Sequence, residues 1–137
     1  MGSRLARKTI LVVEDCEDNA ELLAFLVADE GAVVRKAQSP REALDAMDGS
    51  WRPDVLLLDI SLPGIDGYQL LGALRGVLGA PEVPAIAVTS RAFRQDKERA
   101  LQAGFLEHVA KPYDPKVLVD LVVRVAALNA RRGAAQG

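Results

Sequence analysis

The chain has 137 residues, half of them hydrophobic and 26% charged, so we expect one globular domain with one core, since such domains usually have roughly 100–150 residues. The formal net charge of −2 gives no general attraction to nucleic acid, and no basic patch offsets it. The single cysteine, Cys16, excludes an internal disulfide and a zinc cluster, and no apolar run approaches the about 18 residues of a membrane span, so we expect a cytoplasmic protein.

The first half of the chain alternates short apolar runs with helical patterns. Residues 9–13 form the first run, and Leu and Val residues then repeat every three to four positions after residues 18–19, as in an amphipathic helix. A second short run, Val33 and Val34, precedes a serine and a proline at 39–40, which predict a capped helix that ends at Gly49.

The second half continues the alternation with apolar runs at residues 55–58, 85–88 and 108–110 and a last helical pattern at 114–130. Strands that alternate with helices predict parallel strands joined by right-handed crossovers, with helices on both faces of the sheet. We therefore expect an α/β fold with a doubly wound sheet of five strands, which binds its ligands at the carboxyl ends of the strands. We expect the domain to span residues 8–128, with a disordered segment at 1–7 and a frayed tail at 129–137.

Polar residues stand where the predicted strands end, so the carboxyl edge of the sheet should gather them. They are Glu14, Asp15, Asp59, Thr89, Ser90 and Lys111. Three carboxylates at close range repel one another, a cost that a cation normally offsets, and an all-oxygen ligand set favours Mg²⁺. A carboxylate flanked by Mg²⁺ and a lysine can act as a nucleophile on a phosphoryl group, which predicts an aspartyl phosphate at Asp59.

Four motifs in this order carry a resemblance to a known family: ILVVED at 10–15, LLLDISLPGIDG at 56–67, AVTS at 87–90 and KP at 111–112. Together they resemble the response-regulator receiver domain of two-component signalling, in the CheY-like superfamily. The resemblance implies a flavodoxin-like (βα)5 fold with strand order 2-1-3-4-5. It also implies that Asp59 is phosphorylated by a phosphohistidine of a histidine kinase or a histidine phosphotransfer protein.

The same resemblance assigns the site residues. Glu14, Asp15, Asp59 and the backbone carbonyl of Ser61 would hold Mg²⁺, and Thr89 and Lys111 would contact the phosphoryl group. The peptide bond between Lys111 and Pro112 would be cis. Ser90 and His108 would be switch positions, although His108 departs from the Tyr or Phe that is often found there, so the usual aromatic switch is not expected.

The resemblance places the output surface on the fourth helix, the fifth strand and the fifth helix. In the last helix the predicted core stripe is Leu118, Leu121, Val122, Val125 and Leu128. Further apolar residues, among them Val119 and Val123, flank this stripe. We hypothesise a contact with a downstream protein or a homodimer at these two valines, and ordinary exposed valines remain the alternative.

Other functions are weighed against the same residues. The sequence leaves open a stand-alone receiver domain and a receiver domain cut from a hybrid histidine kinase or a larger regulator. A phosphatase of the aspartyl-phosphate type would need a carboxylate where Ser61 stands, and a flavodoxin would not place acidic residues 14–18 in its phosphate loop. A receiver fold that serves as a scaffold without phosphorylation conflicts with the full acidic cluster and Lys111. We expect no enzyme, only weak self-catalysed phosphotransfer and autodephosphorylation.

Overall fold

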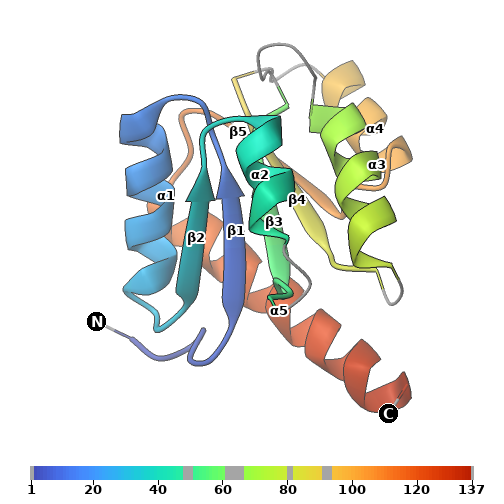
Figure 1. The fold of residues 1–137 in the computed structure, drawn as a ribbon. Helices are drawn as coiled ribbons and strands as arrows, with labels where there is room; N and C mark the ends of the chain where they lie inside the picture. The colour runs from blue at the N-terminus through green and yellow to red at the C-terminus, as the bar shows by residue number, and fades with distance from the viewer. Residues whose placement is uncertain (1, 48–50, 61–66, 80–81, 91–93, 137) are drawn as a thin grey trace.

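The structure is a computed structural model that describes residues 2–47, 51–60, 67–79, 82–90 and 94–136, with the backbone alone for 94–96 and 129–136 (Figure 1). Five parallel strands form one sheet in the order β2-β1-β3-β4-β5, which confirms the predicted flavodoxin-like fold. The strands are β1 (Thr9–Val13), β2 (Val33–Ala37), β3 (Val55–Leu58), β4 (Ala85–Thr89) and β5 (Glu107–Ala110). The helices are α1 (Glu17–Ala28), α2 (Pro40–Ala46), α3 (Gly67–Leu78), α4 (Arg94–Gln102) and α5 (Pro115–Gln136).

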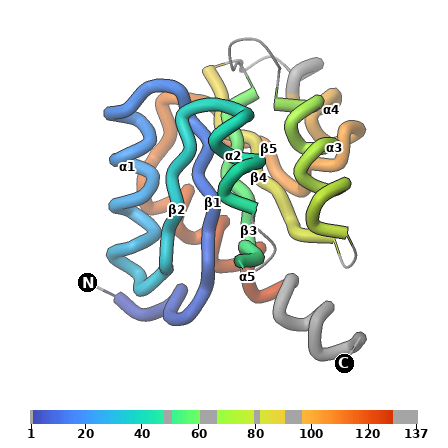
Figure 2. Tube along the Cα trace, in the orientation of Figure 1, coloured from blue at the N-terminus to red at the C-terminus, as the bar shows by residue number. Residues whose placement is uncertain are grey.

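The sheet is covered on both faces, and each face has its own apolar cluster. Figure 2 traces α1 and α5 on one side of the sheet and α2, α3 and α4 on the other. Successive strand residues alternate between the clusters, so that Ile10 packs with Leu23 of α1 and Leu118 of α5, while Leu11 packs with Leu70 of α3. This two-sided burial explains why the strands read as continuous apolar runs.

The register of the strands brings the predicted site residues to one edge. In β1 and β3, Val13 pairs with Leu58, so Glu14 and Asp59 both follow directly after paired residues. The backbone N–H of Asp59 donates to the carbonyl of Val13 at 3.0 Å. On the other side, the N–H of Lys111 donates to the carbonyl of Thr89 at 2.7 Å, which ties the ends of β4 and β5 together.

The helix starts agree with the sequence in part. Ser39 caps α2 and accepts a hydrogen bond from the backbone N–H of Glu42 at 3.1 Å, as predicted. The α2 helix ends at Ala46, and Gly49 lies outside the described residues. The α1 helix begins at Glu17, one residue before the predicted capping stretch, because Cys16 adopts the extended N-cap conformation. The peptide bond between Lys111 and Pro112 is cis, which confirms that prediction.

The predicted disorder of the N-terminal segment is wrong for residues 2–7. Leu5 is fully buried in the cluster beneath α1 and α5, and its N–H donates to the carbonyl of Glu30 at 2.8 Å. Arg4 forms an ion pair with Asp120 of α5 at 2.8 Å. A polar stretch with one leucine has no periodic pattern, so the sequence does not reveal that the folded domain offers that leucine a place in its core.

Two predictions for the last helix are corrected, and a third stays a prediction. The α5 backbone is helical to Gln136, beyond residue 128, where the predicted domain ends, and fraying of the tail from residue 129 is not tested by this. Leu128, predicted in the core stripe, is 40% exposed, since the helix runs past the end of the sheet (Figure 1). Val119, predicted at an interface, is only 7% exposed, whereas Val123 is half-buried and packs against the cluster beneath α1 and α5. Among the described residues, no helix has the length and apolar character needed to cross a membrane.

Candidate functional site

Three carboxylates converge at the carboxyl edge of the sheet. Glu14 and Asp59 are buried, whereas Asp15 is exposed. One carboxylate oxygen from each of the three lies within 4.8 Å of the others. Glu14 and Asp15 come from the end of β1, and Asp59 comes from the end of the neighbouring β3, as the pairing of these strands requires. The predicted acidic cluster is therefore assembled by the fold.

Lys111 places its amine among these carboxylates. Its Nζ lies 2.9 Å from Oε2 of Glu14 and 3.6 Å from Oδ2 of Asp59. The sequence predicted a lysine beside the nucleophilic carboxylate, and the structure adds Glu14 as the nearer partner of Lys111. The backbone hydrogen bond to Thr89 sets where the lysine side chain begins.

Burial and neighbouring charges shift the protonation of two groups in this cluster. Burial raises the pKa of Glu14 and the charge of Asp59 raises it further, although the hydrogen bond from Lys111 acts in the opposite direction. Burial by itself lowers the pKa of Lys111, but its hydrogen bond to Glu14 and the charge of Asp59 outweigh burial, so the pKa is raised. The amine therefore stays protonated at neutral pH.

Two residues at the site were missed by the sequence reasoning. Asn19 donates from Nδ2 to Oε1 of Glu14 at 3.3 Å, and Tyr113 lies half-buried near Glu14. Burial and the Glu14 charge both raise the pKa of Tyr113. Asn19 lies in the first turn of the helix that follows Glu14, so its polar side chain could have been read as facing the site. The position of Tyr113 depends on the turn at Pro112 and had no signal in the sequence.

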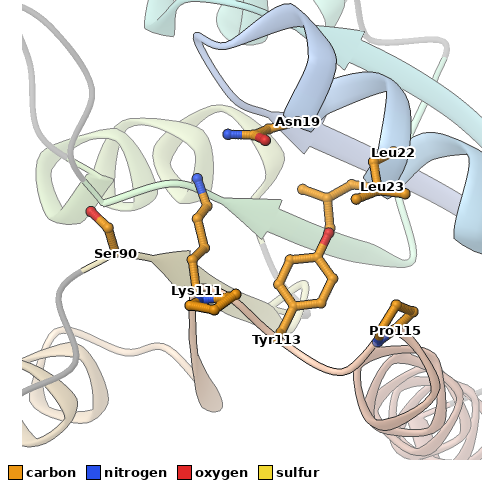
Figure 3. A pocket seen from close by; sticks show the side chains of 8 residues that line it. Asn19, Leu22, Leu23, Ser90, Lys111, Tyr113 and Pro115 are labelled. Carbon is orange, nitrogen blue, oxygen red and sulfur yellow. The ribbon is translucent and has the colours of Figure 1, made fainter.

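A pocket of about 460 Å³ adjoins the acidic cluster (Figure 3). In the view of Figure 3, Lys111 extends between Ser90 and Asn19, and the Tyr113 ring stands beside it and reaches toward α1. The pocket is lined by Asn19, Leu22, Leu23, Ser90, Lys111, Pro112, Tyr113 and Pro115. Among the described residues, none with a carboxylate lines this pocket. The candidate phosphoacceptor Asp59 thus lies near a pocket whose walls are mainly apolar. Leu22 of α1, which lines the pocket, is 45% exposed, and Phe25, about one helical turn further along α1, is 64% exposed.

The remaining predicted site residues are placed as follows. Thr89, the last residue of β4, is fully buried, and Ser90, which follows it, is exposed on the rim of the pocket. His108 is half-buried in β5 and pairs in register with Ala87 of β4. Ser61 lies outside the described residues.

The donor set suits a hard divalent cation. It offers carboxylate oxygens and neither an imidazole nor a thiolate among the three clustered ligands, and this is the chemistry that Mg²⁺ prefers. Burial, and after it the charge of Asp59, raises the pKa of Glu14, and a bound cation would favour the charged form of both carboxylates. The residues therefore fit Mg²⁺, which Glu14, Asp15 and Asp59 would hold.

Comparison with known proteins gives consistent matches. The family model described as the response regulator receiver domain matches residues 10–123. A protein of Leptolyngbya boryana, named an uncharacterized 14.6 kDa protein in the sodA1 3' region, is 40% identical over 86% of this chain and 89% of its own length. The phosphate regulon transcriptional regulatory protein PhoB of Klebsiella pneumoniae is 32% identical over 93% of this chain but only 53% of its own length. The crystal structure of a putative response regulator from Chloroflexus aurantiacus aligns with a TM-score of 0.78 at 34% identity, covering 88% of this chain and 98% of that one.

Proposed function

This chain belongs to the family of response regulator receiver domains of two-component signalling, and we therefore propose that it is a phosphoacceptor switch in which Asp59 takes a phosphoryl group from a phosphohistidine. The donor is a histidine kinase or a histidine phosphotransfer protein. The observation that supports this most strongly is the meeting of Glu14, Asp15, Asp59 and Lys111 at one sheet edge. Their positions in the sequence span 98 residues, so only the fold assembles them.

In the transfer step an oxygen of Asp59 forms a bond to phosphorus while the bond between phosphorus and the donor's imidazole nitrogen breaks. The electron pair of the broken bond returns to the imidazole. Lys111 lies 3.6 Å from Asp59 and offers positive charge to the phosphoryl oxygens, and the Thr89 hydroxyl donates to another of them. Bound Mg²⁺ supplies Lewis-acid neutralisation of the charge on the transferring oxygens. The buried β3 strand holds Asp59 in one orientation.

The donor approaches over the pocket beside Lys111. The pocket opens next to the site, and Leu22 and Phe25 expose apolar surface of α1 at or near its rim. A helical donor protein would bury these side chains as it presents its phosphohistidine. If so, Leu22→Glu and Phe25→Glu slow phosphotransfer from the protein donor and leave phosphorylation by a small donor unchanged. Equal rates with both donors in these variants would contradict this placement.

Output follows from the added charge. A phosphoryl group brings about two negative charges to Asp59 and draws Thr89 and Lys111 toward it. Ser90, directly after β4, and His108, within β5, are the proposed switch positions that respond. We place the contact with a downstream protein, or with a second copy of this chain, on the face formed by α4, β5 and α5. Since Val119 is buried, the exposed apolar residues Val117 and Leu128 and the half-buried Val123 carry the proposed α5 contact.

The deciding experiment is incubation with Mg²⁺ and acetyl phosphate, followed by intact mass measurement. Wild type should gain one phosphoryl group and Asp59→Asn none. Asp45→Asn changes an exposed aspartate of α2 in the same way and should behave as wild type. If wild type gains no phosphoryl group from any donor, the alternative of a scaffold without phosphorylation takes the place of this proposal.

The chain covers 53% of the PhoB protein and 89% of the Leptolyngbya protein. A receiver domain within a hybrid kinase or a larger regulator therefore stays the alternative setting for the same phosphoacceptor chemistry. In either setting we propose a cytoplasmic site of action, supported by the free thiol of Cys16.

A further inference from the structure

The part of the α4 helix whose side chains are described, residues 97–102, buries little apolar surface. Among residues 97–102, whose side chains are described, only Ala100 is buried, and Leu101 is 43% exposed. By contrast, α5 buries six side chains in the core: Leu118, Val119, Leu121, Val122, Val125 and Ala126. Helices with little buried apolar surface open locally at low free-energy cost, so single contacts carry a large share of the stability of α4.

One such contact is a stack of three side chains from three segments. The guanidinium carbon of Arg99 in α4 lies 4.4 Å from the centre of the Tyr68 ring in α3. The Tyr68 ring meets the Phe105 ring edge to face, with centroids 6.1 Å apart and an interplanar angle of 78°. Phe105 is buried between α4 and β5. A cation above an aromatic face is attracted to it, so the stack holds α4 against α3.

The Tyr68 side of this stack is rigidly joined to the phosphoacceptor strand. Gly67, the residue before Tyr68, donates from its N–H to the carbonyl of Ile60 at 2.9 Å. A Cβ at Gly67 would lie only 2.7 Å from the carbonyl oxygen of Asp59, so the start of α3 touches the backbone of the phosphoacceptor itself. The start of α3, from which Tyr68 extends, is therefore in direct contact with the backbone of Asp59.

The Phe105 side is joined to the strand that ends in Lys111. Phe105 immediately precedes Leu106, whose N–H donates to the carbonyl of Ala85 in β4 at 2.8 Å, and β5 begins at the next residue. Arg75 of α3 also donates to the carbonyl of Gly104 at 3.0 Å. The Tyr68 and Phe105 rings thus lie on segments that lead to Asp59 and Lys111. Arg99 joins α4 to the Tyr68 ring.

We propose that the Arg99, Tyr68 and Phe105 stack is a latch through which occupancy of the acidic site by metal or a phosphoryl group changes how often α4 opens. This inference rests on the proposed function, because it takes Asp59 as the group whose state changes. Occupancy changes the charge facing Lys111, and with it the position of β5 relative to the end of β3. Phe105 stands just before β5, and Tyr68 follows the glycine that lies against the backbone of Asp59. Coupling of this kind is reciprocal: the site changes the opening of α4, and the opening of α4 changes binding at the site by the same factor. Weakening the latch should therefore weaken the response of α4 to the site.

Hydrogen exchange of the α4 amides tests the latch in the full chain, with α1 as the internal reference. The three conditions are a chelator, Mg²⁺ alone, and Mg²⁺ with acetyl phosphate. Arg99→Met removes the cation and keeps a long side chain, and should raise exchange of α4 about two- to fivefold in the chelator, as expected for loss of an exposed cation–π contact. Lys97→Met, on the same exposed helix, should leave exchange unchanged.

The coupling is judged from the ratio of α4 exchange between conditions. In wild type, Lys97→Met and Tyr68→Phe, which keeps the ring, we expect exchange to differ by at least about twofold between the empty and the occupied site, the lower end of the same range. In Arg99→Met and Tyr68→Leu the ratio should approach one. If Arg99→Met keeps the wild-type ratio, or leaves α4 exchange unaltered, the latch is refuted. If intact mass shows no phosphoryl gain, the proposed function fails separately, and the comparison of Mg²⁺ with chelator alone decides on the latch.

Discussion

At the carboxyl ends of the strands, buried carboxylates and one amine gather beside an open pocket, whereas at the amino ends Leu5 closes the core and the ion pairs stay exposed. The first edge, here called the reactive edge, buries a carboxyl group, and burial together with the charge of Asp59 raises the pKa of Glu14. The second edge, here called the closed edge, buries the apolar side chain of Leu5 and leaves its charged groups in water. Reactivity and stability are thus separated along the strand direction, and substitutions at the two edges should affect different measurements.

Replacing Lys111 should have the largest effect at the reactive edge. Lys111→Met removes the amine that lies 2.9 Å from Glu14 and 3.6 Å from Asp59. We expect phosphorylation by acetyl phosphate to slow about 100-fold, as for loss of one preorganised electrostatic group in an enzyme site. Lys116→Met, at an exposed position in the first turn of α5, should keep the wild-type rate. A Lys111→Met rate within a few-fold of wild type would show that the amine does not assist transfer.

Replacing Leu5 should have the largest effect at the closed edge. Leu5→Ala leaves a cavity under α1 and α5 and should lower the free energy of unfolding by about 2–5 kcal/mol in urea titrations. The matched change Leu22→Ala, at a 45% exposed position of α1, should cost less than about 1 kcal/mol. If both changes have the same small effect, residues 2–7 do not close the core. Phosphorylation of the Leu5→Ala protein at low temperature should be normal, because the two edges are separate.

Neutralising Glu14 should act on stability and metal binding in opposite directions. A raised carboxyl pKa means that the charged form destabilises the fold above the folded-state pKa, and this cost is relieved as the pH falls toward the ordinary range. Glu14→Gln should therefore raise the urea midpoint at neutral pH without metal. Its Mg²⁺ affinity should fall by at least about tenfold. Glu21→Gln, an exposed change in α1, should alter neither quantity. A destabilised, metal-free Glu14→Gln would show that the bond to Lys111 outweighs burial.

The smallest effect is expected at the exposed ion pairs of the closed edge. Hydrogen bonds from Arg4 lower the pKa of Glu30 below its ordinary 4.5. The stabilisation is therefore present above that pH and is lost as the pH falls through the folded-state pKa. Arg4→Ala should lower the urea midpoint slightly at neutral pH and low salt, and the difference from wild type should shrink in acid and in high salt. Arg41→Ala on α2 is the control. A difference that persists in acid would point to packing of the Arg4 side chain instead.

The sequence by itself determined the fold class, the strand order implied by the family resemblance and the identity of the acidic cluster. It could do so because strand burial and strand ends are written in local patterns: the continuous apolar run before Asp59, the acids after β1 and the lysine and proline after β5. Parallel strands bring their carboxyl ends to one edge, so residues that end strands meet there whatever their distance along the chain.

The tertiary structure alone decided how these residues pair and which apolar side chains are buried. Glu14, and not only Asp59, faces Lys111, and Asn19 and Tyr113 join the site, because these contacts depend on the angles at which α1 and the Pro112 turn leave the sheet. Leu5 is buried without any periodic pattern, and Val119 and Leu128 exchange their predicted roles. Periodicity gives the phase of a helix, but the depth and length of the sheet against which it packs determine where burial begins and ends.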